Sequence, residues 1–271
     1  MTMPKPWYVF ILLISALASN SDASAGEVIV ARSPAGYFEF HIDPWISLHH
    51  FAYHLVRGEQ RELKLRGYVR ITDEDKAALT PGFRSTCASL RTAYRPHIER
   101  SLLFDEQTRR IARELWHGPD KLTDRAVRDA LTECMPVYMA SIWPSHRQVS
   151  QAFLDSLIAR LETHEARMAS SLAMALNSSW PETPIRVDIT PYVIWAGAYT
   201  DDFPPNITLS SIDDTIAHYA FEIVFHESAH TGAFSTSLET AAHAALQEAA
   251  IENDRFWHYI LFFVTGRTVS E

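Results

Sequence analysis

The pattern of apolar and polar positions divides the chain into a helical first half and a mixed second half. Apolar and polar residues alternate over residues 37–42, which predicts a short strand. Asp43 and Pro44 follow as the N-cap and first-turn pair typical of a helix start. Residues 72–143 are helical in pattern with interruptions, and residues 147–177 carry apolar side chains at the spacing of one long helix. The interruptions are expected at Pro96, Gly118-Pro119, Pro136 and Pro144.

Beyond Trp180 and Pro181 the pattern changes to short strands. Alternating, β-branched and aromatic segments predict three of them, at residues 185–189, 192–199 and 207–209. Helices are expected to follow over residues 213–231, 237–251 and 255–265, with Gly266 as the C-terminal stop of the last one. This order of elements predicts an α+β protein that is mostly α, with a small antiparallel sheet next to the first of these three helices.

The first 25 residues have the pattern of a signal peptide. Lys5 supplies a positive start, residues 7–18 form an apolar run, and Ala23-Ser24-Ala25 offers a small-residue cleavage site before Gly26. The apolar run is too short to cross a bilayer as a helix. We therefore expect a secreted or periplasmic protein with no stable membrane span after the signal peptide is removed.

Charge and cysteine content limit the partners and the compartment. The formal net charge of −9 argues against a nucleic-acid groove, which needs a surplus of lysine and arginine on one face. The chain has two cysteines, Cys87 and Cys134. In an oxidising compartment such a pair is expected to form a disulfide, which here would join two helical stretches of the first half.

The segment that carries chemistry is His226-Glu227-Ser228-Ala229-His230, inside a predicted helix. Residues four apart lie one turn apart on the same helix face, so His226 and His230 can both bind one Zn²⁺ at about 2.0–2.1 Å. Glu227 can act as general base on a water at the metal, which also polarises the scissile carbonyl. Two histidines and a glutamate in an apolar helix cost free energy unless they are paired or metal-bound. A zinc site is therefore favoured over a core helix whose polar residues are satisfied.

A catalytic zinc needs a third protein ligand and one open position. The extended pattern His-Glu-x-x-His-x-x-Gly-x-x-His is excluded, because Ala233 stands in place of its glycine and Thr236 in place of its third histidine. The other common arrangement takes the third ligand from a later helix. His258 is the preferred candidate, because a nearby metal would explain a histidine in an otherwise apolar helix. The alternatives are Glu248 and Glu252, followed by His243 and Asp254.

Several segments together resemble a known group of proteins. They are Trp195-Ala196-Gly197-Ala198-Tyr199, Ile207-Thr208-Leu209-Ser210-Ser211, Val224-Phe225-His226-Glu227-Ser228-Ala229-His230, and Trp257-His258 with the apolar helix through Thr265-Gly266. The group consists of uncharacterised exported bacterial proteins regarded as zincin-like zinc metallopeptidases. The resemblance is strongest over residues 192–266, and it favours His258 as third ligand. We divide the chain into a mainly helical region at residues 26–180 and a zincin-like, metal-binding region at residues 181–271, which we expect to form one compact domain together.

Other residues are weaker candidates for roles around the metal. In zincins the strand beside the active helix pairs with an extended peptide, and residues 195–199 are the candidate here, with an ordinary edge strand as the alternative. Tyr199 and His218 are candidates for stabilising an oxyanion. Glu222, one turn before His226, is interpreted as a solvated residue, with orientation of that imidazole as the alternative.

His50 and His54 also stand four residues apart on a predicted helix. No glutamate follows His50, and the helix has an amphipathic pattern. We therefore do not expect a second metal site there.

The sequence thus predicts a zinc-dependent hydrolase, most simply a metallopeptidase acting on a peptide or protein substrate. Zn²⁺ is the expected cofactor, with His226, His230 and His258 as ligands and Glu227 as general base. The alternatives are a non-catalytic zinc-binding module and a helical envelope protein that interacts with a partner and carries the motif by accident. The first alternative binds zinc but does not need Glu227, and the second binds no zinc.

Overall fold

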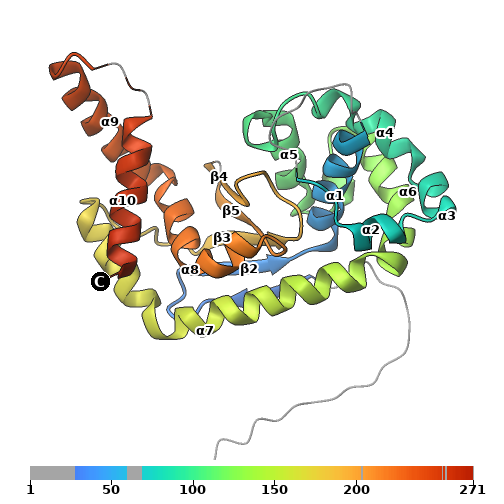
Figure 1. Cartoon of the computed structure of the whole chain (residues 1–271), viewed down its shortest axis with the longest axis horizontal. Helices are drawn as coiled ribbons and strands as arrows, with labels where there is room; N and C mark the ends of the chain where they lie inside the picture. The colour runs from blue at the N-terminus through green and yellow to red at the C-terminus, as the bar shows by residue number, and fades with distance from the viewer. Residues whose placement is uncertain (1–27, 60–68, 203, 252, 254, 271) are drawn as a thin grey trace, which may run out of the picture.

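A computed structural model describes residues 28–59, 69–202, 204–251, 253 and 255–270 (Figure 1). The strands are β1 (Ile29–Arg32), β2 (Phe38–Ile42), β3 (Ile185–Thr190), β4 (Ala198–Asp202) and β5 (Pro205–Ser210). The α-helices are α1 (Pro44–Glu59), α2 (Asp73–Ala78), α3 (Pro81–Thr86), α4 (Ala88–Tyr94), α5 (Glu106–Leu115), α6 (Arg125–Ser141), α7 (Trp143–Ala175), α8 (Asp214–Ala229), α9 (Gly232–Glu248) and α10 (Phe256–Ser270). The predicted α+β class, mostly α, is confirmed. The predicted signal peptide lies outside the described residues.

Helices begin where the sequence places capping side chains. At the start of α1 the Asp43 carboxylate accepts a hydrogen bond from the backbone N–H of Trp45 at 2.7 Å. At the start of α8 the Asp213 carboxylate accepts from the backbone N–H groups of Thr215 and Ile216, at 2.9 and 3.1 Å. The predictions of α1, of α8 and of the long helix α7 are therefore confirmed, although α7 begins four residues earlier than expected.

The five strands form one mixed sheet in the order β1-β2-β3-β5-β4. β2, β3 and β5 are parallel, and β1 and β4 pair antiparallel at the two edges. The expectation of an antiparallel sheet is therefore wrong, and β1 was not predicted. The long helical excursion between β2 and β3 returns the chain in the same direction, and β5 then lies between β3 and β4. Because β2 and β3 pair directly, the first and second halves of the chain share one sheet (Figure 1).

The two faces of the sheet differ in chemistry because side chains alternate along each strand. One face is apolar: Phe38 packs edge-on against Phe225 of α8, with ring centroids 5.4 Å apart. The other face is polar: the Asp188 carboxylate accepts hydrogen bonds from Arg186 of the same strand and from Trp116 Nε1, the latter at 2.9 Å. The helix that carries the His-Glu-x-x-His motif thus packs on the apolar face.

The segment predicted as a strand over residues 192–199 is mostly a loop. The strand begins only at residue 198, and Gly197 before it has a φ of +75°. The Gly197 N–H donates to the Ile194 carbonyl at 2.8 Å, which closes a turn. A Cβ at Gly197 would lie 2.1 Å from Ile216 Cγ1, so only glycine lets this turn approach α8 so closely. The edge strand is therefore β4, three residues further along than residues 195–199.

Two expected helix breaks are also wrong. α6 runs through Pro136, because its core-facing side chains, among them Leu131 and Tyr138, are fully buried and packing outweighs the lost backbone hydrogen bond. α10 runs past Gly266, where a Cβ would lie 3.1 Å from Glu222 Oε1 of α8. The glycine therefore allows α8 and α10 to approach each other instead of ending the helix.

α9 and α10 lie side by side at one end of the molecule (Figure 1). α9 begins at Gly232, earlier than the expected residue 237, and α10 packs against α7, α8 and α9. Four aromatic side chains of α10 remain exposed: Phe256, Tyr259, Phe262 and Phe263. No helix in the described part of the chain combines the length and the hydropathy that a membrane span requires.

The predicted disulfide between Cys87 and Cys134 is confirmed. Cys87 lies at the junction of α3 and α4, and Cys134 lies in α6, with the two Cα atoms 4.8 Å apart. Both residues are buried in the core of the helical half. The bridge closes a loop across a sequence separation of 47 residues.

Replacing both cysteines by alanine is expected to lower the free energy of unfolding by about 4 kcal/mol, because the unfolded chain regains the entropy of the closed loop. Urea unfolding of the Cys87→Ala/Cys134→Ala variant and of the wild-type protein measures this difference. Wild-type protein unfolded in the presence of a reductant should lose a similar amount. A loss below about 1 kcal/mol in both cases would contradict the prediction.

Candidate metal centre

The two motif histidines lie at the C-terminal end of α8. His226 is in its last turn, and His230 is its C-cap residue. Their Nε2 atoms are 3.1 Å apart, and the rings are nearly perpendicular, with centroids separated by 4.8 Å. The helical spacing therefore brings the two imidazole nitrogens together, as the sequence predicts.

His258 reaches the same point from α10. Its ring centroid lies 5.6 Å from that of His226 and 4.9 Å from that of His230. Potential ligand nitrogens of the three residues lie within 4.8 Å of one another, and among the described residues no other group of three possible metal ligands is found. The preferred third ligand is thus brought to the motif.

The other candidates for the third ligand do not join this cluster in the part of the chain that the structure describes. Glu248 is exposed at the end of α9, and His243 is partly buried within the same helix. Glu252 and Asp254 fall outside the described residues.

Aromatic side chains pack against the histidine cluster. The Phe262 ring stacks on His226 with centroids 3.8 Å apart and an interplanar angle of 28°. Trp257 contacts His230 edge-on at 5.5 Å. Phe262 nevertheless remains 51% exposed, so it forms a wall of the cluster that solvent can reach. These contacts restrict the orientation of two imidazoles and give the site an apolar side.

The electrostatics favour neutral imidazoles. Burial, together with the neighbouring His230 and His258, lowers the pKa of His226 to about 3. Burial and His258 lower the pKa of His230 to about 4, and burial and Arg255 lower the pKa of His258. A metal binds the neutral form of histidine, so these residues need no deprotonation at neutral pH to act as ligands.

The donor set fits a zinc ion. Two nitrogens that each bind zinc at about 2.0–2.1 Å in tetrahedral geometry stand about 3.3 Å apart, close to the 3.1 Å between His226 Nε2 and His230 Nε2. For Nε2 to bind a metal, the proton of the neutral ring must sit on Nδ1. His226 Nε2 faces His230 Nε2, while the buried Nδ1 of His226 has no hydrogen-bond partner among the described residues.

Glu227 follows His226 directly in α8 and is not a member of the group of three possible ligands. Its partly buried carboxylate accepts a hydrogen bond from Thr200 Oγ1 of β4 at 2.6 Å. Burial raises the pKa of the Glu227 carboxyl to about 7, although the hydrogen bond from Thr200 acts in the opposite direction. A carboxyl that titrates near neutrality is suited to take up and release a proton at physiological pH.

Sequence reasoning missed Thr200. The predicted strand ended at residue 199, and no local pattern connects a threonine in one strand with a glutamate 27 residues later. The contact between the Thr200 hydroxyl and Glu227 depends on the packing of β4 against α8. A polar residue on the face of an edge strand beside the motif helix would have been the only available signal.

The weaker candidates have contacts outside the histidine cluster. The Tyr199 side chain points to the opposite face of the sheet from Thr200, and its hydroxyl bonds to His50 Nε2 at 3.1 Å. His218 is exposed, and its carbonyl accepts a hydrogen bond from Arg160. Glu222 lies against Gly266 and is partly buried. None of them contacts Glu227 in the described part of the chain.

His50 and His54 are core histidines with hydrogen-bond partners. His50 Nδ1 bonds to the Ile46 carbonyl at 2.9 Å, and His54 Nε2 bonds to the Val193 carbonyl. Both rings are fully buried, and neither belongs to a group of potential metal ligands among the described residues. Both rings therefore have hydrogen-bond partners in the core of the protein.

Comparison with known proteins gives no family or homologue for this chain. No protein-family model matches it, and neither the curated proteins nor the solved structures contain a significant match.

Proposed function

We propose that the protein is a zinc-dependent hydrolase, and specifically a metallopeptidase. The observation that carries the proposal is the convergence of His226, His230 and His258, which come from two different helices; the residue after His226, Glu227, has a carboxyl with a raised pKa. Three imidazoles leave one position of a tetrahedral zinc free for water or substrate. A cluster of neutral, mutually facing histidines has no evident structural benefit without a metal.

The residues around the cluster have separable tasks in this proposal. A zinc ion held by the three histidines would supply a Lewis acid that polarises the scissile carbonyl and lowers the pKa of an attacking water. Glu227 accepts the proton of that water and afterwards delivers it to the leaving amine. The stacked Phe262 limits the movement of His226 and gives the site an apolar side.

β4 is the proposed binding strand for an extended peptide. It is the edge strand of the sheet, paired with β5 alone among the described strands, and it lies beside the motif helix. An edge strand offers free backbone donors and acceptors to a further strand, which is the basis of peptide recognition by strand addition. A helix with the zinc motif beside an antiparallel edge strand also supports a zincin-like core.

We further propose that the protein acts outside the cytoplasm. The disulfide between Cys87 and Cys134 supports this location, because disulfides persist mainly in oxidising compartments. The pattern of a signal peptide in the first 25 residues is the second support.

Zinc content tests the metal site directly. Purified protein from Gly26 onward is expected to hold about one zinc per chain, because three neutral imidazoles suffice for a catalytic site. The His258→Ala variant should lose the metal after dialysis against a weak chelator, since two histidines remain. The measurement is elemental analysis together with circular dichroism to confirm folding.

The matched control is Glu248→Ala, which removes the exposed carboxylate that sequence reasoning left as an alternative ligand. It should bind zinc like the wild-type protein. Wild-type protein that binds no zinc, even after zinc is added back, would refute both the hydrolase and the non-catalytic zinc module. Loss of zinc in Glu248→Ala with retention in His258→Ala would refute the three-histidine site.

A further inference from the structure

β4 contacts the proposed general base through one side chain, Thr200. Its hydroxyl lies 2.6 Å from Glu227 Oε2 and 2.8 Å from the Glu227 carbonyl oxygen, and it donates to either. We propose that Thr200 is a positioning residue that holds the Glu227 carboxylate toward the open side of the metal site. This inference rests on the proposed function, because it assigns a role in the reaction of Glu227.

The geometry gives this hydrogen bond a specific effect. A glutamate side chain has three rotatable bonds, and Glu227 lies in the last turn of α8, which ends at Ala229. Among the described residues, no other side chain donates a hydrogen bond to its carboxylate. The short contact with Thr200 therefore selects one rotamer of Glu227, and general-base catalysis requires the carboxylate to stand within hydrogen-bond reach of the water it deprotonates.

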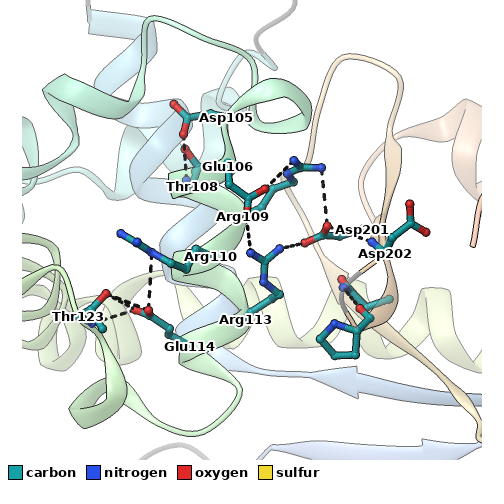
Figure 2. Close-up of polar contacts among 12 residues, drawn as sticks. Asp105, Glu106, Thr108, Arg109, Arg110, Arg113, Glu114, Thr123, Asp201 and Asp202 are labelled. Atoms are coloured by element: carbon teal, nitrogen blue, oxygen red, sulfur yellow. Dashed lines mark hydrogen bonds and ion pairs between the residues drawn. The ribbon is translucent and has the colours of Figure 1, made fainter. Parts of the chain in front are cut away.

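β4 can hold the hydroxyl in place because its neighbouring residues are fixed from both sides of the sheet. Asp201 lies on the face of the sheet opposite to Thr200, because side chains alternate along a strand. Figure 2 shows that Asp201 pairs with Arg113 and Arg109 of α5. Asp201 is only 6% exposed, so this ion pair is well shielded from water. On the Thr200 side, the backbone N–H of Gly232 at the start of α9 donates to Asp202.

This arrangement gives the helical first half a part in the proposed reaction. Arg113 also bonds to Glu106, two turns earlier in α5, so the guanidinium that holds Asp201 is itself oriented (Figure 2). An edge strand with five residues and one paired neighbour would otherwise be free to shift. α5 thereby fixes β4, and β4 fixes the base of the metal site through Thr200.

The test compares Thr200→Val, which has the same shape without the hydroxyl, with Thr200→Ser, which keeps the hydroxyl. Thr200→Val is expected to keep its zinc and its KM while kcat falls by at least about tenfold, because the carboxylate is no longer oriented. Thr200→Ser should restore kcat to near the wild-type value. Equal kcat in Thr200→Val and the wild-type protein, or equal losses in the valine and serine variants, would overturn the proposal.

The control is Thr190→Val in β3. Thr190 is a strand threonine like Thr200, but it is fully buried and its hydroxyl has no hydrogen-bond partner among the described residues. The same chemical change at this position should leave kcat, KM and zinc content unchanged. A loss in Thr190→Val equal to that in Thr200→Val would show a general effect on the sheet and would overturn the specific role of Thr200.

A measurement that does not depend on activity separates this proposal from the proposed function. In metal-free protein, a double-mutant cycle of Thr200→Val with Glu227→Met is expected to change the unfolding equilibrium constant by a coupling factor of about tenfold, as for a hydrogen bond to a charged group. No coupling would refute the contact itself. Wild-type protein that binds zinc and shows the coupling but cleaves no peptide of a random library would refute the proposed function, and with it the role of Thr200 in catalysis.

Discussion

Replacing Glu227 with glutamine is expected to lower kcat for peptide hydrolysis by about 10²–10⁴-fold while leaving zinc content unchanged. Glutamine has nearly the same shape and can still accept the hydrogen bond that Thr200 donates to the carboxylate. It cannot accept the proton of the attacking water, so only the proton-transfer step is lost. Peptide cleavage followed by mass spectrometry, with zinc measured on the same samples, tests this expectation.

Glu222→Gln supplies the matched control. Glu222 lies on the same helix, is partly buried against Gly266, and is not part of the histidine cluster. This variant should cleave peptides at close to the wild-type rate. If Glu227→Gln were as active as the wild-type protein while both bound zinc, the hydrolase proposal would fail and the non-catalytic zinc module would become the better interpretation.

Acid is expected to unfold the metal-free protein cooperatively between about pH 6 and pH 4, because neutral histidines are buried in α1. Burial lowers the pKa of His50 to about 4 and that of His54 to about 3, and it holds the pKa of His49 well below its ordinary value. In the unfolded chain all three titrate near 6.5. Below that pH the unfolded state binds more protons than the folded state, so stability falls as pH falls.

The groups that face these rings do not outweigh the effect of burial, which lowers the pKa of each histidine. His50 contacts the Ile46 carbonyl and the Tyr199 hydroxyl, and Asp188 raises its pKa without outweighing burial. His54 bonds to a backbone carbonyl and lies near Arg57, which lowers its pKa further. Each such histidine contributes up to about 1.4 kcal/mol per pH unit, so three of them contribute about 4 kcal/mol per pH unit. Typical total stabilities are about 5–15 kcal/mol, so the effect is large.

Urea unfolding at several pH values, with a chelator present, measures the slope of stability against pH. His50→Gln removes one titrating ring, so its slope should be shallower than that of the wild-type protein by about 1.4 kcal/mol per pH unit. His117→Gln is the control, since His117 is exposed and its removal should leave the slope unchanged. Equal slopes in all three proteins would contradict the assignment of His50 as a buried neutral group.

Several elements could be predicted because their signals are local. The cap residues Asp43 and Asp213 identify the starts of α1 and α8, and apolar spacing identifies α7. Elements that depend on distant contacts were predicted incorrectly. Pro136 is accommodated inside α6 by core packing, and Gly266 serves the approach of α10 to α8. Local propensity does not report which of these packing arrangements a chain will adopt.

The strands likewise combine features with a local signal and features that depend on distant contacts. β2 and β3 were recognised from alternation, but their parallel pairing depends on where the long helical excursion between them ends. The segment over residues 192–199 has a composition typical of strands, yet the approach of Gly197 to Ile216 makes most of it a turn. The strands β2, β3 and β5 could therefore be predicted, whereas β1, the bounds of β4 and the topology of the sheet could not.

The sequence by itself determined the pair His226 and His230 with Glu227 between them, because helix geometry places residues four apart on one face whatever the rest of the fold does. It also indicated the disulfide, since a chain with two cysteines offers one pairing. Only the tertiary structure decided that His258 joins the pair and that Thr200 contacts Glu227. These contacts connect separate elements, and their formation depends on the packing of α10 and β4 against α8, which no local pattern encodes.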